Sequence, residues 1–112
     1  MKQRKKIVRL MFDYYHEITW FYDLKTGGLV DSIDFIDDDE EIKRLNDEIY
    51  NLCVSFIICD EDGIPRWRNY EKQKKDKYKM LDLLKKLNDR LDEINDGTYV
   101  VDDRLTEYYK KL

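Results

Sequence analysis

The sequence predicts a small α+β protein, in which three to four helices cover a small antiparallel sheet made of two hairpins. A stretch of apolar residues at helical spacing (42–56), two β-rich stretches with glycine turns (18–35 and 54–69) and a long helical second half predict it. The expected order along a single domain, 1–112, is α-ββ-α-ββ-α-α. An all-α helical bundle is the alternative, because both hairpin stretches also permit helix continuation.

The first two elements are predicted from spacing and turn chemistry. Residues 3–17 have apolar side chains three and four apart, which predicts an amphipathic helix. In the stretch 18–35, Ile18, Trp20 and Tyr22 alternate on one side and β-branched and aromatic residues dominate the flanks of a turn. Asp23 to Gly27 fits a type I turn followed by a left-handed glycine. The stretch therefore predicts a hairpin, with continuation of the first helix to Lys25 as the alternative.

The middle of the chain gives the clearest helix. Five consecutive acids, Asp37 to Glu41, place an N-cap and negative charge at its start. The apolar residues that follow recur at spacings of three and four, at Ile42, Leu45, Ile49, Leu52 and Phe56. The stretch 54–69 then predicts a second hairpin, with a turn ending at Gly63. Helix as far as Cys59 is the alternative there.

The second half predicts two helices joined by an extended link. The longest helix runs from about Glu71 to Asn95, with a solvated first half, and Gly97 ends it. Residues 98–101 form the link. Asp102 or Asp103 then caps a final helix whose inward side chains are Leu105, Tyr108, Tyr109 and Leu112.

Charge is abundant and segregated along the chain. Of the 112 residues 25 are acidic and 21 basic, giving a net charge of −4. Residues 13–63 contain fifteen acids and three bases, whereas residues 64–90 contain ten bases and four acids. Such segregation steers encounters with charged partners more than it determines the fold.

The remaining composition indicates a cytoplasmic protein from a bacterium or one of its mobile elements. No stretch approaches the ~18 apolar residues of a membrane span, so no membrane association is expected. The two cysteines, Cys53 and Cys59, have the spacing of neither a redox pair nor a zinc site, and we expect free thiols. The chain contains no alanine, which is typical of AT-rich genomes.

No pattern of catalytic or metal-binding residues is present. His16-Glu17 begins a metal-binding HExxH pattern, but Trp20 stands at the place of the second histidine. The acids Asp60 to Asp62 resemble the start of a calcium loop, but Pro65 stands where that loop needs glycine. We therefore expect a non-catalytic protein without cofactor or metal, and its oligomeric state is left open.

The acidic region predicts a surface for a protein partner with a basic surface, such as a nuclease or another nucleic-acid-handling protein. Exposed aromatic residues would supply anchors beside the carboxylates. The predicted partner-binding residues are Asp37, Asp38, Asp39, Glu40, Glu41, Asp60, Glu61, Asp62, Trp67 and Tyr70.

The segment 66–79 supports an alternative function, that of a nucleic-acid-binding accessory protein that also uses the N-terminal Lys/Arg cluster. Its cations would neutralise phosphates, while Trp67, Tyr70 and Tyr78 would stack on bases. The cations are Arg66, Arg68, Lys72, Lys74, Lys75, Lys77 and Lys79. A solvated helix face explains the same residues without a function, and the acidity of the whole chain opposes phosphate binding.

In layout alone, the order helix, hairpin, acid-capped helix and hairpin resembles that of small bacterial immunity proteins that neutralise secreted nucleases. No shared motif accompanies that similarity. It implies a protein that binds and inhibits another protein, as immunity proteins and phage or plasmid anti-defence inhibitors do. The sequence analysis therefore predicts a small acidic protein-binding inhibitor.

Overall fold

The computed structural model describes residues 5–30 and 33–112, which form a mixed α+β fold, so the all-α alternative is wrong. The elements are β1 (Lys6–Leu10), β2 (Thr19–Asp23), α1 (Asp34–Asp37), α2 (Glu40–Ser55), β3 (Ile57–Cys59), β4 (Pro65–Arg68), α3 (Tyr70–Lys75), α4 (Lys77–Glu93), β5 (Tyr99–Asp103) and α5 (Thr106–Lys110). This order differs from the predicted one at its first and last thirds.

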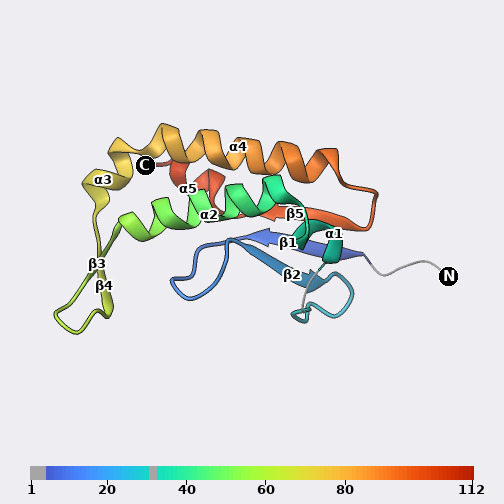
Figure 1. Ribbon diagram of the computed structural model, residues 1–112, viewed down its shortest axis with the longest axis horizontal. Coiled ribbons are helices and arrows are strands. Elements are labelled where there is room, and N and C mark those ends of the chain that lie inside the picture. The colour runs from blue at the N-terminus through green and yellow to red at the C-terminus, as the bar shows by residue number, and fades with distance from the viewer. Residues whose placement is uncertain (1–4, 31–32) are drawn as a thin grey trace.

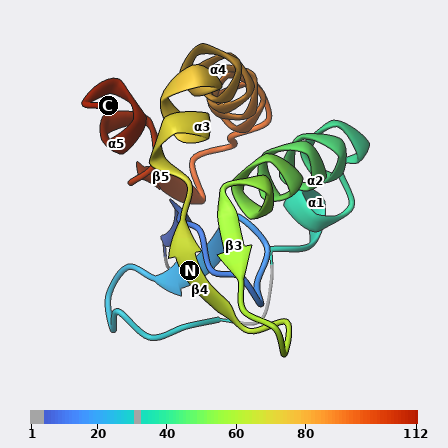
Figure 2. The ribbon, with the colours of Figure 1, turned by 90° about the vertical axis from the view of Figure 1, so that its left-hand side faces the viewer.

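The strands form two separate sheets. In the larger, β1 lies between β2, to which it is antiparallel, and β5, to which it is parallel. The smaller is the antiparallel pair of β3 and β4. Helices α2 and α4 pack side by side over one face of the larger sheet, which gives the molecule two layers (Figures 1 and 2).

The predicted helix over residues 3–17 is wrong where the structure describes it, because residues 6–10 form β1. Val8 and Leu10 are fully buried beneath the helices, whereas Ile7 and Arg9 lie on the opposite face of the sheet. Hydrogen bonding to strands on both sides holds this segment extended. A strand has its apolar residues two apart and a helix has them three or four apart. Over a stretch of only five residues the two patterns cannot be told apart, so the spacing of apolar residues alone does not exclude a helix.

The hairpin expected over 18–35 is confirmed only in its first strand and its turn. Asp23 accepts hydrogen bonds from the backbone N–H groups of Lys25 and Thr26, and Gly27 has a φ of 71°. After the turn, Leu29 forms a single bridge to Tyr22, and β2 pairs with β1 instead. Residues 31 and 32 of the predicted hairpin lie outside the described residues.

The acid-capped helix is confirmed as α2. Asp39 is its N-cap, and the side chain accepts a hydrogen bond of 2.9 Å from the backbone N–H of Ile42. Glu40 and Glu41 occupy the first turn, where carboxylates interact favourably with the helix dipole. The five apolar residues predicted to share one face are all buried: Ile42, Leu45, Ile49, Leu52 and Phe56.

The second hairpin is also confirmed, as β3 and β4. Gly63 has a φ of 78° in its turn, and Pro65 begins β4. We call residues 57–68 the arm, because they project away from the two layers (Figure 1). No member of the hydrophobic core lies between Phe56 and Met80, so the arm contributes nothing to that core.

The predicted long helix is interrupted at Asp76, which separates α3 from α4. The extended link expected over 98–101 is extended from residue 99, but residues 99–101 belong to β5, whose pairing with β1 joins residues more than ninety positions apart. The N-cap of α5 is Leu105 and not the predicted Asp102 or Asp103, although Asp103 Oδ1, at the end of β5, accepts hydrogen bonds from the N–H groups of Leu105 and Thr106 just before and at the helix start. None of the described helices combines the length and the apolar character needed to cross a membrane.

Candidate functional site

The predicted acidic partner-binding residues fall into two groups, at opposite ends of α2. Asp37 to Glu41 lie at its N-terminus, and Asp60 to Asp62 lie at the tip of the arm (Figure 1). The 16 residues of α2 span about 24 Å, so the two groups form no continuous surface. Trp67 and Tyr70 accompany the second group only.

Two of the predicted carboxylates serve the fold. The Asp39 side chain is 11% exposed and pairs with the guanidinium of Arg90 at 2.5 Å, which lowers the pKa of Asp39. The Asp60 side chain pairs with Arg66 at 2.8 Å and accepts backbone hydrogen bonds from Asp62 and Ile64 within the turn. Both carboxylates are already paired within the protein, so they are poorly available to a partner.

The other predicted acids are exposed, except the half-buried Asp37. Glu41 and Glu48 share Arg44 along one side of α2, at 2.5 and 2.8 Å, and Glu40 lies 3.5 Å from Lys43. Surface pairs of this kind contribute at most about 1 kcal/mol each and open readily to competing partners. Asp38, Glu61 and Asp62 are also exposed.

A hollow beside α2 brings together carboxylates from three parts of the chain. We call it the acidic hollow; its volume is about 410 Å³ and it is lined by Glu17, Ile36, Asp37, Ile42, Lys43, Asn46 and Asp47. Glu17 comes from the loop before β2, Asp37 from α1 and Asp47 from α2. The sequence analysis did not single out Glu17 or Asp47, since nothing in the local pattern distinguishes them from other surface acids.

Asn46 adds an unsatisfied polar atom at the acidic hollow. This residue is 7% exposed, and its Nδ2 donates to the Thr19 hydroxyl at 3.3 Å. Its Oδ1 is buried and has no hydrogen-bond partner among the described residues. A buried acceptor without a donor costs free energy, so this atom slightly destabilises the fold beside the hollow.

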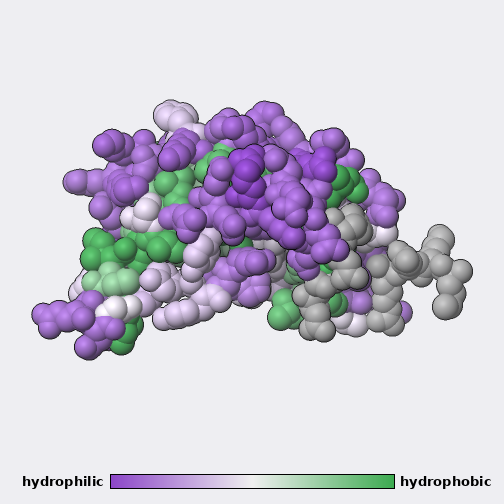
Figure 3. All heavy atoms as spheres, viewed as in Figure 1, coloured by the Kyte–Doolittle hydropathy of each residue, from purple (hydrophilic) through white to green (hydrophobic). Residues whose placement is uncertain are grey.

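The arm exposes apolar and aromatic side chains. Ile58 and Trp67 face each other across its two strands and are 46% and 58% exposed, and Tyr70, just beyond it, is 59% exposed. Figure 3 shows hydrophobic side chains gathered over the arm beside its hydrophilic tip. Exposed apolar groups of this size mark interaction surfaces more often than single surface residues do.

The cations of the predicted nucleic-acid segment are only partly available. Arg66 pairs with Asp60, Lys72 pairs with Asp76 at 2.6 Å, and Lys77 donates to the backbone carbonyls of Lys110 and Leu112. Lys74, Lys75 and Lys79 are exposed. The residues of the N-terminal Lys/Arg cluster before residue 5 lie outside the described residues.

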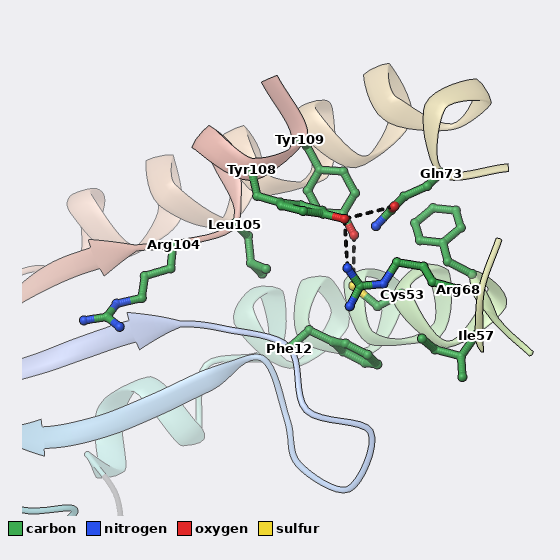
Figure 4. A pocket seen from close by; sticks show the side chains of 10 residues that line it. Phe12, Cys53, Ile57, Arg68, Gln73, Arg104, Leu105, Tyr108 and Tyr109 are labelled. Carbon is green, nitrogen blue, oxygen red and sulfur yellow. Dashed lines mark hydrogen bonds between the residues drawn. The ribbon is translucent and has the colours of Figure 1, made fainter. Parts of the chain in front are cut away.

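A second hollow lies where the arm joins the body (Figure 4). We call it the aromatic hollow; its volume is about 210 Å³ and it is lined by Phe12, Cys53, Phe56, Ile57, Arg68, Gln73, Arg104, Leu105, Tyr108 and Tyr109. Burial raises the pKa of the Cys53 thiol to about 11 and raises that of the Tyr109 hydroxyl as well. Both groups are therefore neutral at pH 7.

Neither cysteine belongs to a disulfide or a metal site. Cys53 is buried and Cys59 half-buried, and both are free thiols, as expected from their spacing. Within residues 5–30 and 33–112, no cluster of three or more His, Cys, Asp or Glu side chains is arranged to hold a metal ion. His16 stacks on Trp20 with 3.6 Å between ring centroids.

Comparison with known proteins gives no relative for this fold and these sites. No protein-family model, curated protein or solved structure matches the chain significantly. The function has to be inferred from the chain's own residues.

Proposed function

We propose that this protein is a non-catalytic inhibitor that binds a protein partner with a basic surface, and that the acidic hollow receives a lysine or arginine side chain of that partner. The observation that carries the proposal is the convergence of Glu17, Asp37 and Asp47 on one hollow. The predicted acids Asp38, Glu40 and Glu41 lie close by in sequence, at the start of α2, and extend the negative surface.

Two of the three carboxylates at this hollow, Glu17 and Asp47, are not neutralised by the described residues. Lys43 is the only cation among the described residues that line it, and Lys43 already lies near Glu40. No described cation is within ion-pairing distance of Glu17 or Asp47. A partner's guanidinium would offset these charges, which gives both affinity and fast association.

The layout similarity to immunity proteins no longer supports the inhibitor class, since residues 6–10 form a strand and not a helix. What supports binding to a protein is the combination of a carboxylate-lined hollow with exposed aromatic residues elsewhere on a small domain. Aromatic residues are enriched at protein interfaces relative to the rest of a protein surface.

A capture experiment tests the proposal. The immobilised protein is exposed to a lysate of its source cell at about 50 mM and about 500 mM salt, where screening weakens charge pairing. We expect a basic protein to bind at low salt only. Glu17→Gln/Asp47→Asn should reduce its capture about tenfold, which corresponds to 1.4 kcal/mol.

The matched control is Glu61→Gln/Asp62→Asn, which removes the same charge at the tip of the arm and should leave capture unchanged. Equal loss in both variants would show that only net charge matters, and the acidic hollow would then have no specific role. Loss of the partner after nuclease treatment of the lysate would favour the nucleic-acid alternative, in which Trp67, Tyr70, Lys74, Lys75 and Lys79 make the contacts.

A further inference from the structure

Arg68 differs from every other arginine that the structure describes. Each of the others lies within ion-pairing distance of at least one carboxylate, although the pairs differ in exposure. Those residues are Arg9, Arg44, Arg66, Arg90 and Arg104. Among the described residues no carboxylate lies within 4 Å of the Arg68 guanidinium, even though acids outnumber bases in this chain.

The unpaired guanidinium lies at the aromatic hollow. In Figure 4 the Arg68 side chain extends from β4 over the hollow toward Tyr108, whereas Arg104 points away from it. Arg68 Nη1 donates to the Tyr108 hydroxyl at 2.9 Å, and the guanidinium carbon lies 5.7 Å from the centre of that ring. The Tyr108 hydroxyl in turn donates to Oε1 of the buried Gln73 at 3.1 Å. These contacts orient the guanidinium.

Most donors of Arg68 remain available. A guanidinium has five N–H groups in a planar fork, and the contact with Tyr108 uses one of them. Such a fork matches the two oxygens of a carboxylate. No acidic side chain among the described residues lines the aromatic hollow, and its thiol and buried phenol are uncharged at neutral pH, so these residues supply no competing anion there.

Apart from Arg68, Gln73 and Arg104, the hollow is lined mainly by apolar and aromatic side chains, and it is small. Phe12, Phe56, Leu105 and the two tyrosines provide its walls. Its volume of about 210 Å³ is below the roughly 300–1,000 Å³ of sites for drug-sized ligands, so it would hold one ring or one branched aliphatic group and not a nucleotide.

We infer that the aromatic hollow binds a small organic acid, whose carboxylate pairs with Arg68 and whose apolar body enters between Phe12, Leu105 and Tyr109. This site is separate from the acidic hollow, and neither inference depends on the other. The ligand class follows from the unpaired cation at the mouth and the apolar walls behind it.

Titration of the ¹⁵N-labelled protein with phenylacetate, followed by ¹H–¹⁵N NMR, tests this inference. We expect a dissociation constant on the order of 1 mM, as is usual for so small a ligand. The amide signals of Leu105 and Tyr109 should shift. The neutral analogue phenylacetamide, which has the same shape, should bind at least tenfold more weakly because it cannot pair with the guanidinium.

Two arginine variants separate a specific site from general charge. Arg68→Gln should weaken phenylacetate binding at least tenfold, and Arg68→Lys should weaken it less because it retains the charge without the fork. Arg66→Gln, on the same strand but paired with Asp60, should leave binding unchanged.

The inference is overturned if phenylacetate causes no shift at these residues up to about 10 mM, which is ten times the expected constant. It is equally overturned if phenylacetamide binds as well as the acid, or if Arg68→Gln binds like the unaltered protein. The same spectra report whether each variant is folded. None of these outcomes bears on capture of a basic protein by the acidic hollow.

Discussion

At the scale of single residues, the fold uses some of its many carboxylates and leaves others for contact with partners. Asp39 caps α2, pairs with Arg90 on α4 and is largely buried, so one side chain joins the two main helices. Its immediate neighbour Asp38 is exposed. Adjacent aspartates in a run of five acids therefore have different physical roles.

Asp39→Ala should lower the free energy of unfolding at pH 7 by about 1–2 kcal/mol, because an N-cap is lost. The pKa of Asp39 in the folded protein is below its usual value, so its charged form stabilises the fold above the unfolded-state pKa of about 3.9. That contribution is lost as the pH falls through the lowered folded-state pKa.

Urea unfolding of this variant at pH 7 and at pH values below 4 measures the effect. The difference from the unaltered protein should shrink at the lower pH values. Asp38→Ala is the matched control and should change stability by less than about 0.5 kcal/mol, as is typical of surface substitutions. A deficit for Asp39→Ala that does not depend on pH would contradict the role given to its charge.

At the scale of elements, the connections between helices and strands determine which parts of the molecule unfold together. Gly97 has a φ of 95° where the chain leaves α4 for β5, and Gly63 has a φ of 78° in the turn of the arm. At both positions an added Cβ would meet open space, so only backbone strain distinguishes glycine from alanine. Alanine substitution at Gly97 and at Gly63 therefore introduces the same kind of backbone strain in two different elements.

Gly97→Ala should lower the free energy of global unfolding by about 1 kcal/mol, because non-glycine residues are disfavoured at positive φ. Gly63→Ala carries similar strain, but an isolated two-stranded hairpin is only marginally stable and can open locally. It should therefore speed amide exchange within the arm and leave the urea midpoint unchanged. Equal shifts of the midpoint in both variants would show that the arm unfolds together with the body.

At the scale of the whole molecule, a two-layer body carries an arm that is not part of its core. The molecule extends 52 Å along its longest axis, and the arm leaves the end of α2 and returns to α3. At its base the backbone N–H of Asn69 donates to the carbonyl of Phe56 at 2.7 Å, which brings the two ends of the arm together. This arrangement predicts that the body folds without the arm.

Replacement of residues 58–67 by Asn-Gly, a dipeptide that favours a tight turn, should leave the body folded. Its free energy of unfolding should change by no more than about 1 kcal/mol, since no core residue is removed. Circular dichroism and urea unfolding measure this. Loss of cooperative unfolding would show that the arm is needed for the fold.

Local chemistry allowed several elements to be predicted from the sequence. The N-cap and apolar stripe of α2, the turns at Gly27 and Gly63, and the end of α4 all depend on interactions among residues close in the chain. Because such interactions involve only residues that are close in the chain, the sequence alone is enough to predict them. The exposed position expected of Trp67 and Tyr70 as anchors is confirmed as well.

The strands β1 and β5 could not be predicted in this way, because their conformation depends on pairing with each other across the whole length of the chain. The two candidate sites, the acidic hollow and the aromatic hollow, likewise depend on contacts between parts of the chain that are far apart in the sequence. Glu17, Asp37 and Asp47 become neighbours only when the loop before β2 lies against α1 and α2, and Arg68 becomes an unpaired cation only relative to the carboxylates around it. The sequence by itself determined the turns, the capped helix and the abundance of charge, whereas the tertiary structure decided which charges are neutralised and which converge, because only distance in space sets those interactions.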